Sequence, residues 1–179
     1  MRIEKTKILP LTLTGIIIIF DQITKAVIAL KWPIIPPGQA VFIIDIFNND
    51  FFQIIHVRNK AIAFSLGSGI PDSVKPVLFV ILPILVLGVL VWYYLRSNDF
   101  TNIQRWAVAG ILGGGIGNII DRVFRSDGVV DFISVKFYGL FGFERWPTFN
   151  IADSSVVVCC LLLFITIIFT PKKTEVPVK

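Results

Sequence analysis

The chain has 179 residues, of which 55% are hydrophobic and 16% are charged, and its mean hydropathy is +0.79. This composition excludes an ordinary soluble domain, because several apolar runs approach the ~20 residues that cross a bilayer. The formal net charge of +5 does not indicate a nucleic-acid partner, because no basic face with interleaved aromatic residues is present.

Hydropathy and flanking residues predict four membrane-spanning helices. We place them at residues 8–30, 74–95, 106–122 and 150–170. No internal repeat, low-complexity tract or flexible linker interrupts the sequence. We therefore expect residues 1–179 to form a single integral membrane domain.

The distribution of Lys and Arg predicts the orientation. Segments 1–7, 96–105 and 171–179 carry eight of these residues in 26 positions, whereas 31–73 and 123–149 carry six in 70. Because loops rich in Lys and Arg stay in the cytoplasm, we expect both termini inside and the two long loops outside.

The first span has two interpretations. Basic residues before the apolar run Ile8–Phe20 are typical of a cleaved secretory signal. Asp21 and Lys25, however, directly follow that run and can pair as helical i,i+4 neighbours, which favours a retained span. The pair is either an anchor at the interface or a contact to a lipid headgroup or substrate.

The first long loop predicts a small extracytoplasmic sheet. Two strand-like runs, Val41–Ile46 and Phe51–Val57, follow a Pro-rich turn at Pro36-Pro37-Gly38. The apolar content of the runs favours a sheet that rests on the membrane. Asn59–Ser65 is expected to be a short helical or turn segment that points back to the bilayer. In the second span, Pro83 is expected to cause a kink.

The third span carries two rows of small residues. Gly110 and Gly114 form one small-xxx-small pair, and Gly113 and Gly117 form another, so a neighbouring helix can approach closely. Four residues further along, the first row reaches Asn118 and then Arg122, and the second row reaches Asp121. The pattern is a strong packing signal and, alone, a weak catalytic one.

Two further acids lie beside the predicted spans. Asp131 has large hydrophobic neighbours in Val129-Val130-Asp131-Phe132-Ile133, which would desolvate its carboxyl and raise its pKa. Taken alone, however, this stretch favours a membrane-surface strand whose one Asp faces water. Asn150 and Asp153 begin the fourth span, where an N-cap and a helix-dipole acid are ordinary features. Ala152 is expected to leave space beside the Asp153 carboxylate.

The predicted topology brings these polar residues to one depth near one face of the membrane. They are Asn118, Asp121, Arg122, Asp131, Asn150 and Asp153. Carboxylates in apolar surroundings are costly, so such a cluster indicates function, and paired carboxylates can activate water for peptide hydrolysis. No second His or Cys stands at ligand spacing from His56, so we expect no metal site.

Five segments, in order, resemble the lipoprotein signal peptidases, the bacterial type II signal peptidase family of aspartic peptidases. They are Asp21-Gln22-Ile23-Thr24-Lys25, Arg58–Ser65, Gly114-x-x-Gly117-Asn118-x-x-Asp121-Arg122, Val129–Ile133 and Phe149-Asn150-Ile151-Ala152-Asp153. One departure is that Ala61 and Ile62 replace the Gly and first Ala of the family pattern Asn-x-Gly-Ala-Ala-Phe. Lys136–Pro147 is difficult to match and is interpreted as a local elaboration.

The resemblance implies four transmembrane helices with a small extracytoplasmic β-cradle and a short mobile helix from loop 31–73. It also implies a multi-pass protein of the bacterial inner membrane, with its active site near the outer face. The implied substrate is a diacylglyceryl-modified prolipoprotein cut just before the lipidated Cys, and globomycin-type inhibitors are implied to block the enzyme. No cofactor is implied.

The resemblance assigns catalysis to Asp131 and Asp153. The implied substrate-binding or supporting residues are Asp21, Lys25, Asn59, Gly114, Asn118, Asp121, Arg122, Asn150 and Ala152. Within this scheme, Arg122 is expected to anchor Asp121, and the helix dipole favours Asp153 as the ionised acid.

Two other functions fit the residues. A four-span transporter or channel can use carboxylates as an ion path, with polar groups at several depths. A non-catalytic assembly factor can use the glycine rows to bind partner helices.

Overall fold

A computed structural model describes residues 5–34, 44–59, 70–71 and 73–169. Four of its helical segments are long and apolar enough to cross a membrane: Lys5–Lys31, Val77–Arg96, Asn102–Phe124 and Ile151–Phe169. A small antiparallel sheet accompanies them. The predicted architecture of four spans and a small sheet is therefore confirmed. The predicted mobile helix, the Pro36-Pro37-Gly38 turn and the Ala61-Ile62 departure fall outside the described residues.

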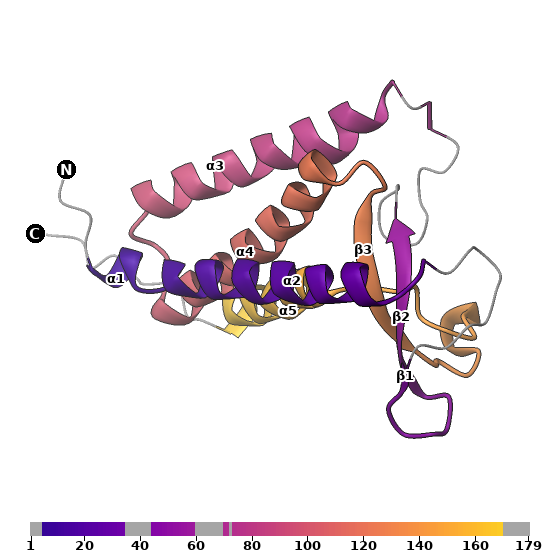
Figure 1. Ribbon diagram of the computed structural model, residues 1–179. Coiled ribbons are helices and arrows are strands. Elements are labelled where there is room, and N and C mark those ends of the chain that lie inside the picture. The colour runs from indigo at the N-terminus through magenta and orange to yellow at the C-terminus, as the bar shows by residue number, and fades with distance from the viewer. Residues whose placement is uncertain (1–4, 35–43, 60–69, 72, 170–179) are drawn as a thin grey trace, which may run out of the picture.

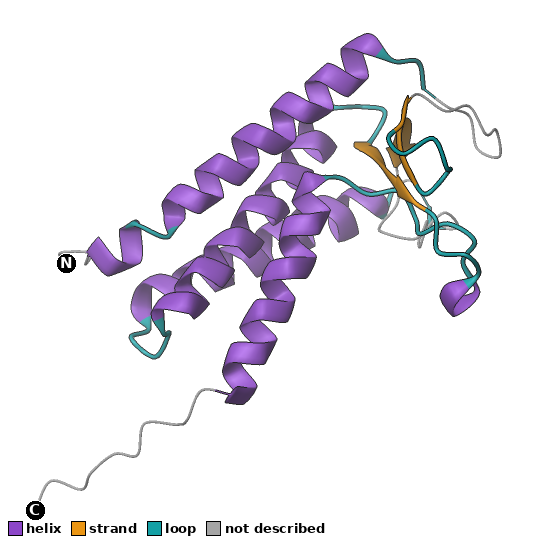
Figure 2. Cartoon of the chain, turned by 90° about the horizontal axis from the view of Figure 1, so that it is seen from below, coloured by secondary structure: helices purple, strands orange, loops and turns teal. Residues whose placement is uncertain are grey.

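The helices form a bundle with the sheet across one end (Figures 1 and 2). The first span comprises α1 (Lys5–Ile8) and α2 (Leu11–Lys31), and the second comprises a π-helical turn, η2 (Val77–Ile81), and α3 (Leu82–Arg96). The third span is α4 (Asn102–Phe124), and the fourth is α5 (Ile151–Phe169). The π-helical turn ends two residues before Pro83, which stands in the first turn of α3 and whose missing N–H removes one helical hydrogen bond.

The sheet has the order β1-β2-β3. Its strands are β1 (Ile44–Asp45), β2 (Phe52–Asn59) and β3 (Val129–Val135), and a short 3-10 turn, η3 (Leu140–Gly142), follows β3. Asn48 and Asp50 take positive φ angles of 52° and 64° in the turn between β1 and β2. Asn and Asp tolerate this left-handed conformation better than most residues. The β2–β3 register places Val57 opposite Asp131 and Asn59 opposite Val129.

The glycines of α4 bring two other helices close to it. A Cβ on Gly114 would lie 2.3 Å from the Ala152 carbonyl oxygen of α5, whereas a Cβ on Gly113 would lie 2.9 Å from Ile17 Cβ of α2. The two predicted small-residue rows thus face two different helices. Because their backbones approach α4 closely, α2 and α5 deliver their polar residues to one place beneath the sheet.

Candidate active site

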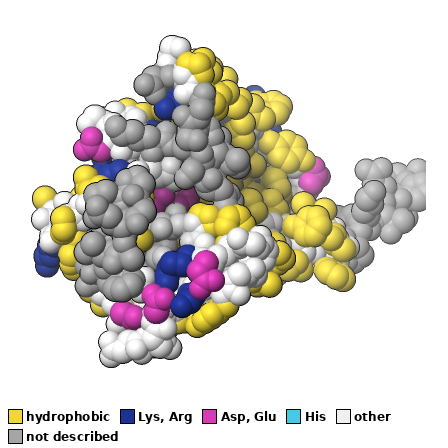
Figure 3. All heavy atoms as spheres, turned by 90° about the vertical axis from the view of Figure 1, so that its right-hand side faces the viewer, with side chains coloured by type: hydrophobic (Ala, Val, Ile, Leu, Met, Phe, Trp, Pro, Cys, Tyr) yellow, Lys and Arg dark blue, Asp and Glu magenta, His cyan; other side chains and the backbone are white. Residues whose placement is uncertain are grey.

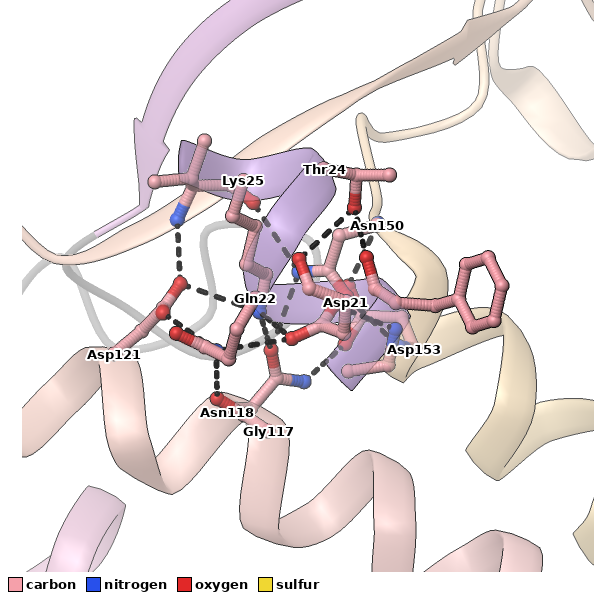
Figure 4. A network of polar contacts seen from close by, with 12 residues as sticks. Asp21, Gln22, Thr24, Lys25, Gly117, Asn118, Asp121, Asn150 and Asp153 are labelled. Carbon is pink, nitrogen blue, oxygen red and sulfur yellow. Dashed lines mark hydrogen bonds and ion pairs between the residues drawn. The ribbon is translucent and has the colours of Figure 1, made fainter. Parts of the chain in front are cut away.

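A buried charge network joins α2 to α4 (Figure 4). Asp21, Lys25 and Asp121 are all 0% exposed. Lys25 Nζ lies 2.8 Å from Asp21 Oδ2 and 3.2 Å from Asp121 Oδ2. The predicted i,i+4 pair is therefore confirmed, and it has a second acid across the helix interface. Buried charges of this kind are tolerated only when they are paired and hydrogen-bonded.

The second cation on Asp121 is not the one that the sequence predicted. Arg125 Nε lies 3.0 Å from Asp121 Oδ1; Arg125 is the C-cap residue of α4 and the i,i+4 neighbour of Asp121. The Arg122 Nη1 atom instead donates to the Asn118 carbonyl oxygen at 3.3 Å, and Arg122 lines the cavity described below. Residues four apart lie on one helix face whereas adjacent ones diverge, so the assignment of the anchoring role to Arg122 was wrong.

This network holds the chain segments that carry the other acids. Asp21 Oδ1 accepts a hydrogen bond from the Ala152 N–H at 3.0 Å, at the start of α5. Asp121 Oδ2 accepts one from the Val130 N–H at 3.1 Å, beside Asp131 in β3. Gln22 Nε2 donates to both carboxylates, each at 3.1 Å. Gln22 was not predicted as a site residue. Its position between the predicted site residues Asp21 and Lys25 is the sequence signal that could have identified it.

Asn118 connects the network to Asp153. Lys25 Nζ donates to Asn118 Oδ1 at 2.9 Å, and Asn118 Nδ2 donates to Asp153 Oδ1 at 2.7 Å. Because an ammonium group only donates hydrogen bonds, it fixes which end of the Asn118 amide faces Lys25. The other end, a donor, is thereby directed at the Asp153 carboxylate.

Asp131 lies on the inward face of β3 and is 2% exposed. Its Oδ2 accepts a hydrogen bond from Asn59 Nδ2 at 2.9 Å, and its Oδ1 accepts one from Asn150 Nδ2 at 2.7 Å. Burial and then the negative charge of Asp153 raise the pKa of Asp131 to about 7, against the opposing effect of the two amide donors. The desolvated interpretation of Asp131 is confirmed, and the water-facing alternative is wrong.

Asn150 links the two acids at the start of α5. Its Oδ1 accepts from the Asp153 N–H at 2.9 Å, while its own N–H donates to Asp153 Oδ2 at 3.2 Å. This reciprocal pattern is that of a capping box. The ordinary capping role and the contact to Asp131 are thus performed by one side chain.

Ala152 packs at the contact between α5 and α4. It is 0% exposed and packs against Gly114 and Gly117, where an added Cβ on Gly117 would lie 3.3 Å from the Ala152 Cβ. The small side chain therefore permits close packing of α5 against α4.

Asp131 and Asp153 line one cavity of about 590 Å³. Its other polar lining comes from Asn59, Asn118, Arg122, Thr148 and Ser154. Apolar residues supply most of the rest, including Val157 and Val158 of α5, which are 58% and 62% exposed on the outer surface of the bundle. The cavity therefore reaches from the acids to a surface that a bilayer would cover. Among the described residues, no cluster of three or more His, Cys, Asp or Glu has an arrangement that would hold a metal ion.

Known proteins match nearly the whole chain. The family model for signal peptidase II matches residues 13–169. The lipoprotein signal peptidase of Treponema pallidum is 43% identical over 96% of this chain and 89% of its own length, and that of Treponema denticola is 45% identical over 94% and 93%. The solved structure of a bacterial membrane enzyme shares 30% identity, with a TM-score of 0.72 over 95% of this chain and 94% of that one. The chain therefore belongs to the signal peptidase II family of aspartic, lipoprotein-processing membrane peptidases.

Proposed function

We propose that this protein removes the signal peptide from diacylglyceryl-modified prolipoproteins by cutting just before the lipidated Cys. In this proposal, Asp131 and Asp153 hold the attacking water between them. The supporting observation is that a buried acid, Asp131, and a half-buried acid from a distant segment, Asp153, line one cavity and are joined through Asn150. The whole chain acts as one catalytic domain in the bacterial inner membrane.

The proposed mechanism gives the two acids different roles. Burial raises the pKa of Asp131 to about 7, so Asp131 is the protonated member at rest. Asp153 accepts a hydrogen bond from Asn118 Nδ2 and stands in the first turn of α5, and in this mechanism it acts as the base. This agrees with the assignment made from the helix dipole.

In the reaction, the Asp153 carboxylate takes a proton from the water, whose oxygen forms a bond to the scissile carbonyl carbon. Asp131 donates its proton to the developing oxyanion. Return of that proton to Asp131 re-forms the carbonyl as the C–N bond breaks, and Asp153 delivers its proton to the departing amine. Asn59 and Asn150 hold Asp131, while Lys25, acting through Asn118, holds Asp153.

The cavity's position suits a lipid-anchored substrate. Each buried methylene contributes about 0.8 kcal/mol to membrane binding, so two acyl chains would hold the substrate in the bilayer. Val157 and Val158, on the outer surface of α5, line the same cavity as the acids. A substrate held in the outer leaflet can then place its peptide bond at the acids without leaving the bilayer. Globomycin-type inhibitors are expected to occupy this cavity.

Separate Asp131→Asn and Asp153→Asn variants test the proposal. We expect each to lower the release of signal peptide from a diacylglyceryl-modified peptide by about a hundredfold to ten-thousandfold, since each removes one proton-transfer group. Asp127→Asn is the matched control, because Asp127 is exposed in the loop before β3 and should retain full turnover. Near-normal turnover in either active-site variant, with insertion confirmed, would falsify the water-activating pair.

A further inference from the structure

A hairpin outside the family's motifs forms part of the cavity. We call Lys136–Trp146 the outer hairpin. Its two ends pair as a β-bridge between Lys136 and Arg145, and the Phe137 N–H donates to the Glu144 carbonyl oxygen at 2.9 Å. Its tip turns through left-handed conformations, with φ angles of 51° at Tyr138 and 56° at Phe141. The hairpin follows β3 directly, only a few residues beyond Asp131.

The outer hairpin presents an aromatic pair to the cavity. Phe137 and Trp146 both line it, and their ring centroids are 4.8 Å apart at an interplanar angle of 32°. Val135 and Pro147, at the two ends of the hairpin, continue the same apolar wall. Aromatic rings provide large contact area with few rotatable bonds, which suits a surface that binds an apolar group.

Each of the two aromatic residues follows a cationic residue that pairs with Asp50. Lys136 precedes Phe137, and Arg145 precedes Trp146. Lys136 Nζ and Arg145 Nη1 each lie 3.0 Å from the Asp50 carboxylate. Arg145 Nη1 also donates to the Asp50 carbonyl oxygen at 2.8 Å, and Arg145 Nε donates to Ser134 Oγ at 2.9 Å. One carboxylate in the β1–β2 turn therefore fastens both arms of the outer hairpin. Figure 3 shows acidic and basic side chains gathered together at this end of the molecule.

The ion pairs of Asp50 with Lys136 and Arg145 favour the ionised form of Asp50, and they are partly exposed to solvent. Hydrogen bonding from Lys136, with the charges of Lys136 and Arg145, lowers the pKa of the Asp50 carboxyl from its ordinary value of 3.8. The Asp50 side chain is 41% exposed and the Lys136 side chain is 24% exposed. Dissolved salt should therefore screen the contact.

We propose that Phe137 and Trp146 are specificity-determining residues that bind an apolar group of the lipidated substrate, and that Asp50 is a positioning residue that holds them in place. The inference rests on the proposed function. An unfastened hairpin would have to be ordered when substrate binds, and this ordering cost would weaken binding. Chemistry at Asp131 and Asp153 would be unaffected, so the effect should fall on KM and leave kcat unchanged.

Asp50→Asn in the full-length protein, reconstituted in liposomes, tests the positioning role. We expect KM for a diacylglyceryl-modified peptide to rise about fivefold, the scale of an exposed ion-pair contact, with kcat unchanged. Added salt should raise KM of the parent protein toward the variant's value and should leave the variant's KM nearly constant. Glu144→Gln is the matched control, because Glu144 is on the same hairpin, 70% exposed, and lies 3.8 Å from Lys136; its KM should not change.

Trp146→Ala and Phe137→Ala test the binding role. Each should lower kcat/KM by about tenfold through lost apolar contact, and Trp146→Phe should restore most of the loss. Substrates with shortened acyl chains, and substrates with Ala in place of apolar signal-peptide residues near the cut, identify the bound group. The bound group is the one whose alteration abolishes the difference in kcat/KM between the parent protein and Trp146→Ala.

Two results would overturn the inference. One is unchanged KM and substrate preference in Asp50→Asn, Phe137→Ala and Trp146→Ala. The other is a loss confined to kcat in all three variants. Failure of the proposed function would look different, because Asp131→Asn would then retain turnover of the same lipidated peptide.

Discussion

Asp131 shows how one residue's surroundings set its chemistry. Its two oxygens receive amide donors from Asn59 and Asn150, which favour the charged form, yet burial has the larger effect and raises the pKa to about 7. The side chain is therefore an acid near neutral pH that remains hydrogen-bonded in both states. A group that must first donate and then recover a proton needs this balance.

The pH dependence of catalysis follows from this raised pKa. In the proposed mechanism the protonated Asp131 supplies the acid, so kcat/KM should be level just below pH ~7 and fall about tenfold per unit above it. Initial rates on a diacylglyceryl-modified peptide between pH 5 and 9 would measure this, as a property of the coupled pair of acids. Rates that rose steadily across that range would contradict the assignment of Asp131 as the acid.

The same pKa predicts a change in stability. The folded protein holds a proton on Asp131 that the unfolded chain loses at its ordinary pKa of 3.8. The stability contributed by this proton is therefore fully present below pH ~4 and is lost as the pH rises through about 7. Thermal unfolding of the detergent-solubilised protein should show this decline, and the decline should be smaller in Asp131→Asn. An equal decline in the two proteins would exclude Asp131 as its source.

Lys25 should matter more for stability than any exposed cation. Lys25→Met would leave Asp21 and Asp121 buried without their shared ammonium, at a cost of about 3–5 kcal/mol. We expect a lower unfolding temperature and reduced turnover, because the orientation of Asn118 is no longer fixed. Lys31→Met, an exposed change at the end of the same helix, is the control. Equal unfolding temperatures for the two variants would contradict this account.

At the level of elements, the glycines of α4 set the site's geometry by setting helix distances. Gly114 lies against the Ala152 carbonyl of α5, and Gly117 lies against the Asp21 carboxylate of α2, where an added Cβ would be 2.8 Å from Oδ2. The helix that carries Asn118 and Asp121 is thereby held close to the helices that carry their partners. Small-residue packing and the polar network thus depend on each other.

Gly114→Ala tests this dependence. The added methyl group would lie 2.3 Å from the Ala152 carbonyl oxygen, so α4 and α5 must separate and Asp153 must shift. We expect a lower unfolding temperature and a loss of turnover of at least about a hundredfold, since small displacements at reacting groups have effects of this size. The control is Gly88→Ala in α3, where nothing lies within 4 Å of the added atom. Full turnover in Gly114→Ala would contradict the packing argument.

At the level of the whole molecule, the buried carboxylates Asp21, Asp121 and Asp131 gather at one end of the bundle. The sheet lies at that end, whereas α1 and the C-terminal end of α5 lie at the other (Figure 1). A transporter would place carboxylates at several depths, so this distribution favours an enzyme at one membrane face. Ion flux in liposomes without cleavage of lipidated peptide would select the transporter instead.

The distribution of Lys and Arg predicts that the sheet end faces away from the cytoplasm. An epitope tag added after Lys179 should therefore be protected from protease in intact cells whose outer barrier has been opened, and cleaved after the inner membrane is permeabilised. A tag inserted in the outer hairpin between Gly139 and Leu140, where the side chains are exposed, should be cleaved in both cases. The reverse pattern would contradict the orientation.

The sequence alone determined the four spans, the close-packing rows of α4 and the acids of the candidate site. These properties are local or periodic, because span length, glycine spacing and apolar flanks can each be recognised within one segment. The i,i+4 pair of Asp21 and Lys25 was predictable for the same reason.

Only the tertiary structure decided which distant partners meet. It placed Asp121 between Lys25 and Arg125, turned Asp131 into the interior, and brought Asp50 to Lys136 and Arg145, which are 86 and 95 residues away in sequence. It also gave Ala152 a packing role. Such contacts depend on the relative rotation of packed helices and on strand register, and a one-residue change in register would reverse which side chains face the cavity. These quantities are set by the packing of the entire chain, so no single segment encodes them.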